Sequence, residues 1–145
     1  MTLHPMKTLM ADAHARGYAV PAFNCANLEM IQCVLRTAAE LRAPVILGIH
    51  PVEIAYMGSA SIAVAIARGV AEDLKVDYAI HQDHGDSVET CIRSIRGGFT
   101  SVMYDGSHLP IAQNAANARE VVKIAHACGV TVEGELGCLG NLETG

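Results

Sequence analysis

The sequence predicts an α/β protein with a parallel sheet, organised as about the first half of a (β/α)8 TIM barrel. Expected strands begin near residues 18, 45, 77, 99 and 130, close to the roughly 30-residue repeat of a βαβ unit. The segments between them have apolar residues on one side, as helices that cover a parallel sheet do. Polar residues follow the carboxyl ends of successive strands, and in a barrel these ends meet at one mouth.

The first two units can be followed in order. Met6–Arg16 has helical spacing, and Gly17 stands where that helix ends. Residues 18–23 have the pattern of a strand, and Asn27 is placed to cap the next helix. The apolar residues of that helix are three and four positions apart: Ile31, Val34, Leu35, Ala38 and Leu41. Val45–Ile49 is a continuous apolar run, typical of a strand covered on both faces.

The next two units follow the same plan. A glycine-containing loop at residues 57–59 leads into a third helix with an apolar stripe on one side. That stripe consists of Ile62, Ile66, Val70 and Leu74. Residues 77–82 form the third strand, and Asp86 with Glu89 has the spacing of a capping box for the fourth helix. Residues 99–104 form the fourth strand.

Two architectures fit this alternation, an open doubly wound sheet and a barrel. The polar residues at strand ends favour the barrel, because an open sheet would spread them along a line. They are Asn24, His50, Asp83, His84, Asp105, His108 and Glu135, the last after a fifth strand at residues 130–133. A full barrel needs about 250 residues. We therefore expect residues 1–145 to be the amino-terminal half of a single barrel, four β/α units plus strand five, truncated at the carboxyl end.

Residues 78–85 are the stretch that carries the chemistry, since an apolar strand runs directly into Asp83, His84 and Gly85. Consecutive strand residues point to opposite faces, so the carboxylate and the imidazole share a site only if the backbone leaves the ladder there. Gly85 permits such a turn. Imidazole binds Zn²⁺ and a neighbouring carboxylate can move a proton. The alternative is that Asp83 and Asp86 cap the next helix and His84 is a solvated loop residue.

Composition narrows the classes of function. With 51% hydrophobic and 17% charged residues, the 145-residue chain has enough apolar content for one core. A formal net charge of −5 gives no broad basic surface for nucleic acid or for an acidic membrane. The 5 cysteines are odd in number and form no C-x-x-C pair, so neither a disulfide framework nor a thiolate zinc site is expected. We expect a cytoplasmic protein with no membrane or nucleic-acid partner.

Five stretches resemble the class II, metal-dependent ketose-bisphosphate aldolases, which include fructose- and tagatose-bisphosphate aldolases. They run in family order and span nearly the whole chain. They are VPAFN at residues 20–24, APVIL at 43–47, HQDHG at 81–85, GFTSVMYDGSHLP at 98–110 and VEGELGCLG at 132–140.

The resemblance implies a role for each matching residue. Asp83 matches the catalytic group that donates and accepts a proton at the aldol hydroxyl. His84 matches the first zinc ligand, and Asp105 and Glu135 match carboxylates at a second or alternative metal position. Asn24 matches an asparagine that contacts the substrate.

Two further positions follow from the resemblance. Glu143 falls where many fructose-bisphosphate members carry a catalytic loop glutamate that takes a proton from the three-carbon ketone. His50 stands where the family usually has a serine that contacts phosphate, and it either replaces that contact or alters which substrate fits. Structural alternatives remain: a backbone bond at Asn24, a turn at Asp105, an ion pair at Glu135 and a solvated side chain at Glu143.

The implied function is that of a zinc-dependent class II aldolase of carbohydrate metabolism, with a second divalent or monovalent cation allowed beside the Zn²⁺. It would cleave fructose 1,6-bisphosphate reversibly to dihydroxyacetone phosphate and glyceraldehyde 3-phosphate, a reaction of glycolysis. Tagatose bisphosphate, another ketose phosphate, or an inactive half-barrel that only self-associates are the alternatives. Lys7, Lys75 and Lys123 lie away from strand ends, which argues against a Schiff-base route.

The expected partners are a small sugar phosphate and further copies of the chain, as a dimer or tetramer. By the resemblance, two more zinc histidines and the phosphate-binding loops belong to the other half of the barrel. We therefore expect the isolated chain to be inactive. We also expect it to associate, because half a barrel leaves sheet edges unpaired.

Overall fold

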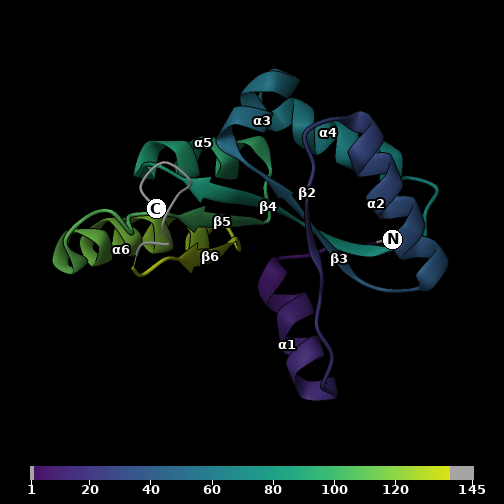
Figure 1. Ribbon diagram of the computed structural model, residues 1–145, viewed down its shortest axis with the longest axis horizontal. Coiled ribbons are helices and arrows are strands. Elements are labelled where there is room, and N and C mark those ends of the chain that lie inside the picture. The colour runs from purple at the N-terminus through teal and green to yellow at the C-terminus, as the bar shows by residue number, and fades with distance from the viewer. Residues whose placement is uncertain (1, 138–145) are drawn as a thin grey trace, which may run out of the picture.

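The computed structural model describes residues 2–137, which form one parallel sheet with helices along it (Figure 1). The main path of the sheet follows chain order, β2-β3-β4-β5-β6. These strands are β2 (Ala22–Asn24), β3 (Val45–Ile49), β4 (Asp77–Gly85), β5 (Ser101–Tyr104) and β6 (Thr131–Gly134). A short strand, β1 (Thr2–Leu3), pairs in parallel with the start of β4. Growth in one direction only is the order of a barrel, whereas a doubly wound sheet would reverse. The predicted α/β barrel class is confirmed.

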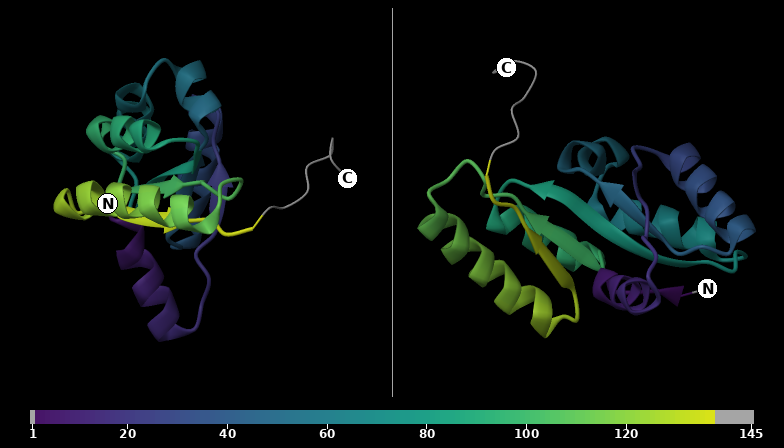
Figure 2. Two further views of the ribbon diagram at one scale, coloured as in Figure 1. Left: turned by 90° about the vertical axis from the view of Figure 1, so that its left-hand side faces the viewer. Right: turned by 60° about the horizontal axis from the view of Figure 1, so that its bottom comes forward.

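The described residues form six helices beside the strands. In Figure 1 most of them follow the convex side of the curved sheet. They are α1 (Met6–Arg16), α2 (Leu28–Leu41), α3 (Pro51–Met57), α4 (Ala60–Ala71), α5 (Val88–Gly97) and α6 (Ile111–Ala127). Figure 2 shows α1 set apart from that row, on the other side of the strands. No single helix in residues 2–137 is long and apolar enough to cross a membrane; α3 and α4 reach that length and composition only together, bent by 78°.

Strand alternation divides the interior into two cores. Val45, Leu47 and Ile49 of β3 are buried with α2 and α4 in the larger core, on the outer face of the sheet. Ile46, between them, packs with Leu9 of α1 and with Ala79 of β4 in a second, smaller core. Since alternate residues of a strand point to opposite faces, α1 covers the inner face near the amino-terminal ends of the strands. The rest of the inner face, toward the carboxyl ends, is left for polar residues.

Several boundaries differ from the sequence prediction. The strand expected at residues 18–23 is formed only by β2, because Pro21 has no N–H to donate to a ladder. Neither β1 nor α3 was predicted. His50 begins α3: its ring accepts from the backbone N–H of Val52, and its own N–H donates to the Glu53 carboxylate at 2.7 Å. Pro51, the first residue of α3, suits this position because its fixed φ is already helical.

The two predicted helix caps had different outcomes. Asn27 caps α2 as expected, with its Oδ1 accepting from the backbone N–H of Met30 at 2.9 Å. The predicted capping box of Asp86 was wrong by one residue, because Ser87 caps α5 by accepting from the N–H of Thr90. Asp86 instead accepts from the hydroxyls of Ser87 and Thr90, so it supports the cap.

Two helical glycines give a matched test of this packing. A Cβ on Gly97 of α5 would lie 2.4 Å from the Cβ of Ala60 in α4, whereas a Cβ on Gly69 would meet nothing within 4 Å. We expect Gly97→Ala to lower the free energy of unfolding by about 1–3 kcal/mol through overpacking. Gly69→Ala should raise it by about 0.5–1 kcal/mol, as in an ordinary helix. Urea unfolding measures both, and equal stabilisation by the two substitutions would contradict the close α4–α5 contact.

Candidate metal centre at the strand ends

The last residues of β4 leave regular strand geometry. His84 has a φ of 47°, in the left-handed region, and the pairing of β4 with β5 shifts register between Gln82 and Gly85. The predicted departure from the ladder at Asp83 and His84 is confirmed, but the positive φ belongs to His84 and not to Gly85. Gly85 is needed for space, because a Cβ there would lie 2.6 Å from the carbonyl oxygen of Met103. The shift lets Asp83 and His84 reach one site, with Asp83 Oδ1 3.9 Å from His84 Nε2.

Three side chains from neighbouring strand ends meet beside this shift. His84 Nδ1 lies 2.9 Å from Oδ2 of Asp105, after β5, and 3.4 Å from Oε2 of Glu135, after β6. The other oxygen of Asp105 accepts from the backbone N–H of Ser107 at 3.0 Å, which fixes the orientation of this carboxylate. One ligand atom from each of the three residues lies within 4.8 Å of the others. We call His84, Asp105 and Glu135 the strand-end cluster.

The cluster shifts the pKa values of its members. The hydrogen bond to Asp105 raises the pKa of His84, and the carboxylates of Asp83 and Glu135 add to this, although desolvation opposes it. Desolvation alone would raise the pKa of Asp105, but hydrogen bonds from Ser107 and His84 outweigh it and lower the pKa to about 2. An ionised carboxylate only accepts, so Nδ1 of His84 carries the proton that it donates to Asp105.

The donor set suits a divalent cation. One imidazole nitrogen and two carboxylates are ligands that Zn²⁺ accepts in proteins. Because Nδ1 of His84 faces both Asp105 and Glu135, a cation held by all three would take the place of the Nδ1 proton. The residues present therefore fit a metal ion, with their side chains 45%, 22% and 21% exposed, respectively, and so open to ligands.

The other predicted site residues lie around the cluster or outside the described part. The ring of His50 is 6.2 Å from that of His84, centroid to centroid. Asn24 ends β2, where it pairs with Gly48 of β3, and its Oδ1 would lie 3.1 Å from a Cβ on Gly48. Glu143 lies outside residues 2–137. The roles of these residues stay predictions.

Sequence reasoning did not single out three polar residues of the inner face. Nδ1 of His81 lies 2.8 Å from the hydroxyl of Ser101, and its Nε2 lies 3.4 Å from Oε2 of Glu133. Strand alternation was the signal that could have found them, since His81 lies two residues beyond the inward Ala79, and Glu133 two residues before Glu135.

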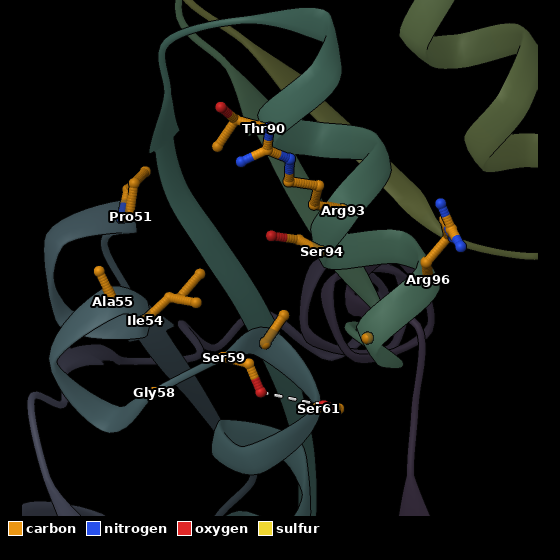
Figure 3. A pocket seen from close by; sticks show the side chains of 12 residues that line it. Pro51, Ile54, Ala55, Gly58, Ser59, Ser61, Thr90, Arg93, Ser94 and Arg96 are labelled. Atoms are coloured by element: carbon orange, nitrogen blue, oxygen red, sulfur yellow. Dashed lines mark hydrogen bonds between the residues drawn. The ribbon is translucent and has the colours of Figure 1, made fainter.

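A cavity of about 580 Å³ lies beside the site, between α3, the start of α4 and α5 (Figure 3). In Figure 3, Ser94 is directed into this space and Arg96 away from it. Arg93, also in its lining, is paired with Glu89 at 2.6 Å. Among the described residues its lining includes no member of the strand-end cluster. Within the part of the chain that the structure describes, the cavity and the strand-end cluster are therefore separate features.

Comparison with known proteins agrees with the fold. The sequence model of a family described as fructose-bisphosphate aldolase class-II matches residues 4–145. A fructose-bisphosphate aldolase of Nostoc sp. strain PCC 7120 is 45% identical, over 100% of this chain and 42% of that protein. One of Staphylococcus aureus strain Mu50 is 44% identical, over 99% of this chain and 51% of that protein.

Solved structures give the same result. The YdjI aldolase of Escherichia coli K12 matches with a TM-score of 0.84 and 29% identity, over 97% of this chain and 53% of that one. The chain thus spans about half the length of the relatives it matches. The resemblance found in the sequence motifs is confirmed at the level of family and fold.

The cluster predicts a pH-dependent effect of Asp105→Asn in the metal-free chain. Without the carboxylate the pKa of His84 should fall toward its ordinary value, because the hydrogen bond that His84 donates to Asp105 is the main cause of its increase. A histidine whose pKa is higher in the folded than in the unfolded state stabilises the folded state at pH values below its unfolded-state pKa. This stabilisation is lost as the pH rises through the folded-state pKa. Asp105→Asn should therefore cost more stability at about pH 5.5 than at about pH 8.5.

Urea unfolding at the two pH values and an NMR titration of His84 measure this effect. Asp12→Asn is the matched control, since Asp12 accepts from Arg16 and Tyr18, neither of which titrates between these two pH values. Its cost should be similar at both pH values. An unchanged His84 pKa in Asp105→Asn would contradict the geometry.

Proposed function

Because the chain belongs to the class II fructose-bisphosphate aldolase family, we propose that a barrel completed around it cleaves a ketose 1,6-bisphosphate. The observation that carries this proposal is the strand-end cluster with Asp83 beside it, 3.9 Å from His84. Fructose 1,6-bisphosphate is the proposed substrate, with dihydroxyacetone phosphate and glyceraldehyde 3-phosphate as products. The names of the relatives at 44–45% identity support this choice.

Zinc is the cation we assign to the cluster, with a second cation allowed nearby. A bound Zn²⁺ would act as a Lewis acid toward the ketone oxygen and stabilise the negative charge that aldol cleavage develops. The chain's own part is to hold the ion: His84 supplies the nitrogen, and Asp105 and Glu135 supply negatively charged oxygens. The backbone N–H of Ser107 keeps Asp105 turned toward the imidazole.

Asp83 is the proposed acid and base. Its side chain is 24% exposed, so it can reach a substrate hydroxyl at the mouth while its position beside His84 is kept by the register shift of β4. A carboxylate there can take the proton of the hydroxyl whose carbon–carbon bond breaks, and return it in the reverse direction. Glu143 is proposed as the second proton-transfer residue, on the three-carbon ketone.

Asn24 and His50 are proposed to contact the substrate. Nδ1 of His50 accepts from the N–H of Val52, so a neutral ring carries its proton on Nε2. His50 therefore offers an N–H donor near His84, suited to a phosphate oxygen. Asn24, at the end of β2, offers an amide.

The remaining proposals rest on membership of the same family. We propose that residues 1–145 are the amino-terminal half of one barrel, whose outer strands β2 and β6 pair with further strands in the complete protein. A sugar phosphate is the proposed small-molecule partner, in glycolysis and in the cytoplasm. The complete protein is proposed to be a dimer or tetramer, and the half-barrel alone to be inactive.

A completed barrel tests the function directly. Joining this chain to the carboxyl-terminal part of the Nostoc relative supplies the missing strands. The joined protein should cleave fructose 1,6-bisphosphate, lose activity with a chelator and regain it with Zn²⁺. Cleavage that persists at full rate after complete metal removal would overturn the proposal. A parallel assay with tagatose 1,6-bisphosphate shows which of the two epimers is the substrate.

Substitutions at Asp83 and His84 should fail in different ways in the completed barrel. Asp83→Ala should retain zinc and lose roughly 10²–10⁴-fold in turnover, the usual worth of acid–base help. His84→Ala should lose the metal, because it removes the nitrogen ligand. Metal analysis beside the kinetics separates the two, and parental turnover by Asp83→Ala would show that its assigned role is wrong.

Replacing His50 by serine tests its role without disturbing α3, because serine is also a good helix cap. His50→Ser should retain or improve activity on fructose 1,6-bisphosphate. His50→Ala should mainly raise KM, roughly 10–100-fold if a hydrogen bond to a charged group is lost. Val52→Ala, a change at a 70% exposed residue of the same helix, is the control and should leave KM unchanged. If neither His50 variant changes KM, His50 serves only as a cap.

A further inference from the structure

The inner face carries a second polar layer below the strand-end cluster. His81 of β4, Ser101 of β5 and Glu133 of β6 lie on three adjacent strands, and we call them the inner-face trio. His81 is 5% exposed and Ser101 0%, whereas the Glu133 side chain is 48% exposed. Helix α1 covers the layer from the other side, where the thioether of Met6 lies 3.7 Å from the Ser101 hydroxyl. The histidine is thus held between a buried hydroxyl and a half-exposed carboxylate.

The partners of His81 determine which nitrogen carries the proton. Burial lowers the pKa of His81 to about 4, so the ring is neutral near pH 7. If the proton were on Nδ1, Nε2 would face Oε2 of Glu133 as a second acceptor, and the Ser101 hydroxyl would be left with a weak thioether acceptor. With the proton on Nε2, Ser101 donates to Nδ1 at 2.8 Å and Nε2–H faces the carboxylate. Only this arrangement pairs a donor with an acceptor at both nitrogens.

Glu133 needs such a partner because of where it lies. Glu133 lies in β6, two residues before Glu135, which follows the strand. Residues two apart in an extended chain point to the same face of a sheet and are about 7 Å apart. Burial, and to a smaller extent the charges of Asp83 and Glu135, raise the pKa of Glu133. A glutamate side chain can cover this distance, and a cation in the cluster would attract it as a further ligand.

We propose that His81 is a positioning residue: through Nε2–H it holds the Glu133 carboxylate on the inner face, so that Glu133 stays out of the strand-end cluster when a cation is bound there. The inference rests on the proposed metal role of that cluster. It explains why the tautomer of a buried histidine is set by Ser101 from the adjacent strand. Keeping Glu133 away leaves a coordination position open for a substrate oxygen.

The tautomer is measured first, on the unmodified and metal-free chain. With histidine-selective ¹⁵N labelling, long-range ¹H–¹⁵N spectra distinguish the two nitrogens, and loss of one signal set in His81→Gln assigns His81. We expect a single neutral form protonated at Nε2. Ser101→Ala should convert it to a mixture of tautomers, whereas Ser94→Ala, which removes a hydroxyl that is also buried, should not. A parent ring protonated at Nδ1 would overturn the proposal.

Cobalt binding tests the positioning role, with CoCl2 titrated into the 145-residue chain. Replacing His81 by leucine frees Glu133, so His81→Leu should bind Co²⁺ about ten-fold more tightly, because affinity rises with the number of charged ligands. Adding Glu133→Gln to this variant should restore parental affinity. Glu133→Gln alone should leave affinity unchanged, and His81→Gln, which retains an N–H donor, should behave as the parent.

The outcomes separate this inference from the metal site itself. Weaker Co²⁺ binding by Glu133→Gln alone would mean that Glu133 is already a ligand, and the positioning role would be wrong. Parental affinity in His81→Leu would also contradict it. If the parent chain binds no Co²⁺, or if substitutions at Asp105 and Glu135 leave its Co²⁺ affinity unchanged, the metal role of the cluster fails. The nitrogen spectra then decide by themselves whether His81 holds Glu133. For that purpose Glu133→Leu should produce mixed tautomers.

Discussion

The site depends on the left-handed backbone of His84 at the end of β4. A regular strand would send Asp83 and His84 to opposite faces of the sheet. A non-glycine residue at a φ of 47° stores strain of order 1 kcal/mol, and the contacts of its ring with Asp105 and Glu135 help to hold it there. Gly85 allows β5 to approach closely enough for those contacts, because any side chain there would overlap Met103. The strained backbone of His84 and the assembly of the strand-end cluster therefore have one origin.

Hydrophobic period and strand spacing were sufficient to predict most of the fold. The strands from β3 to β6 and the helices that cover them have apolar residues at regular spacing. Burial of these residues contributes more to their formation than individual local contacts do. What escaped prediction was short: β1 has 2 residues and α3 has 7. Elements of this length are stabilised by individual contacts, here the pairing of Thr2 with Asp77 and the cap at His50. Such contacts cannot be recognised from periodicity, because their partners are far apart in the sequence or belong to an uncommon residue type.

The same reasoning explains which site residues could be predicted. His84 lies in the last residues of β4, and Asp105 and Glu135 directly follow β5 and β6. Because strand ends converge in a barrel, the sequence pattern alone predicted that these three residues lie close together. His81 and Glu133 lie inside strands, among mostly apolar residues. A polar residue there can be recognised as part of a site only when it is known which face of the sheet its side chain is on. Their pairing needs the register between β4, β5 and β6, which the sequence pattern does not specify to one residue.

Charge links the two polar layers of the inner face. Asp83, Asp105, Glu133 and Glu135 lie near the imidazole of His84. The hydrogen bond to Asp105 and the nearby carboxylates raise the pKa of His84, and burial, followed by the charges of Asp83 and Glu135, raises the pKa of Glu133. Like charges at such separations oppose folding unless a positive group lies among them. A protonated His84 supplies one positive charge and a divalent cation would supply two, so a cation held by the strand-end cluster would also stabilise the fold around it. The neutral His81 cannot serve in this way: its part is to direct one carboxylate, by a hydrogen-bond donor, away from the place where the charge is needed.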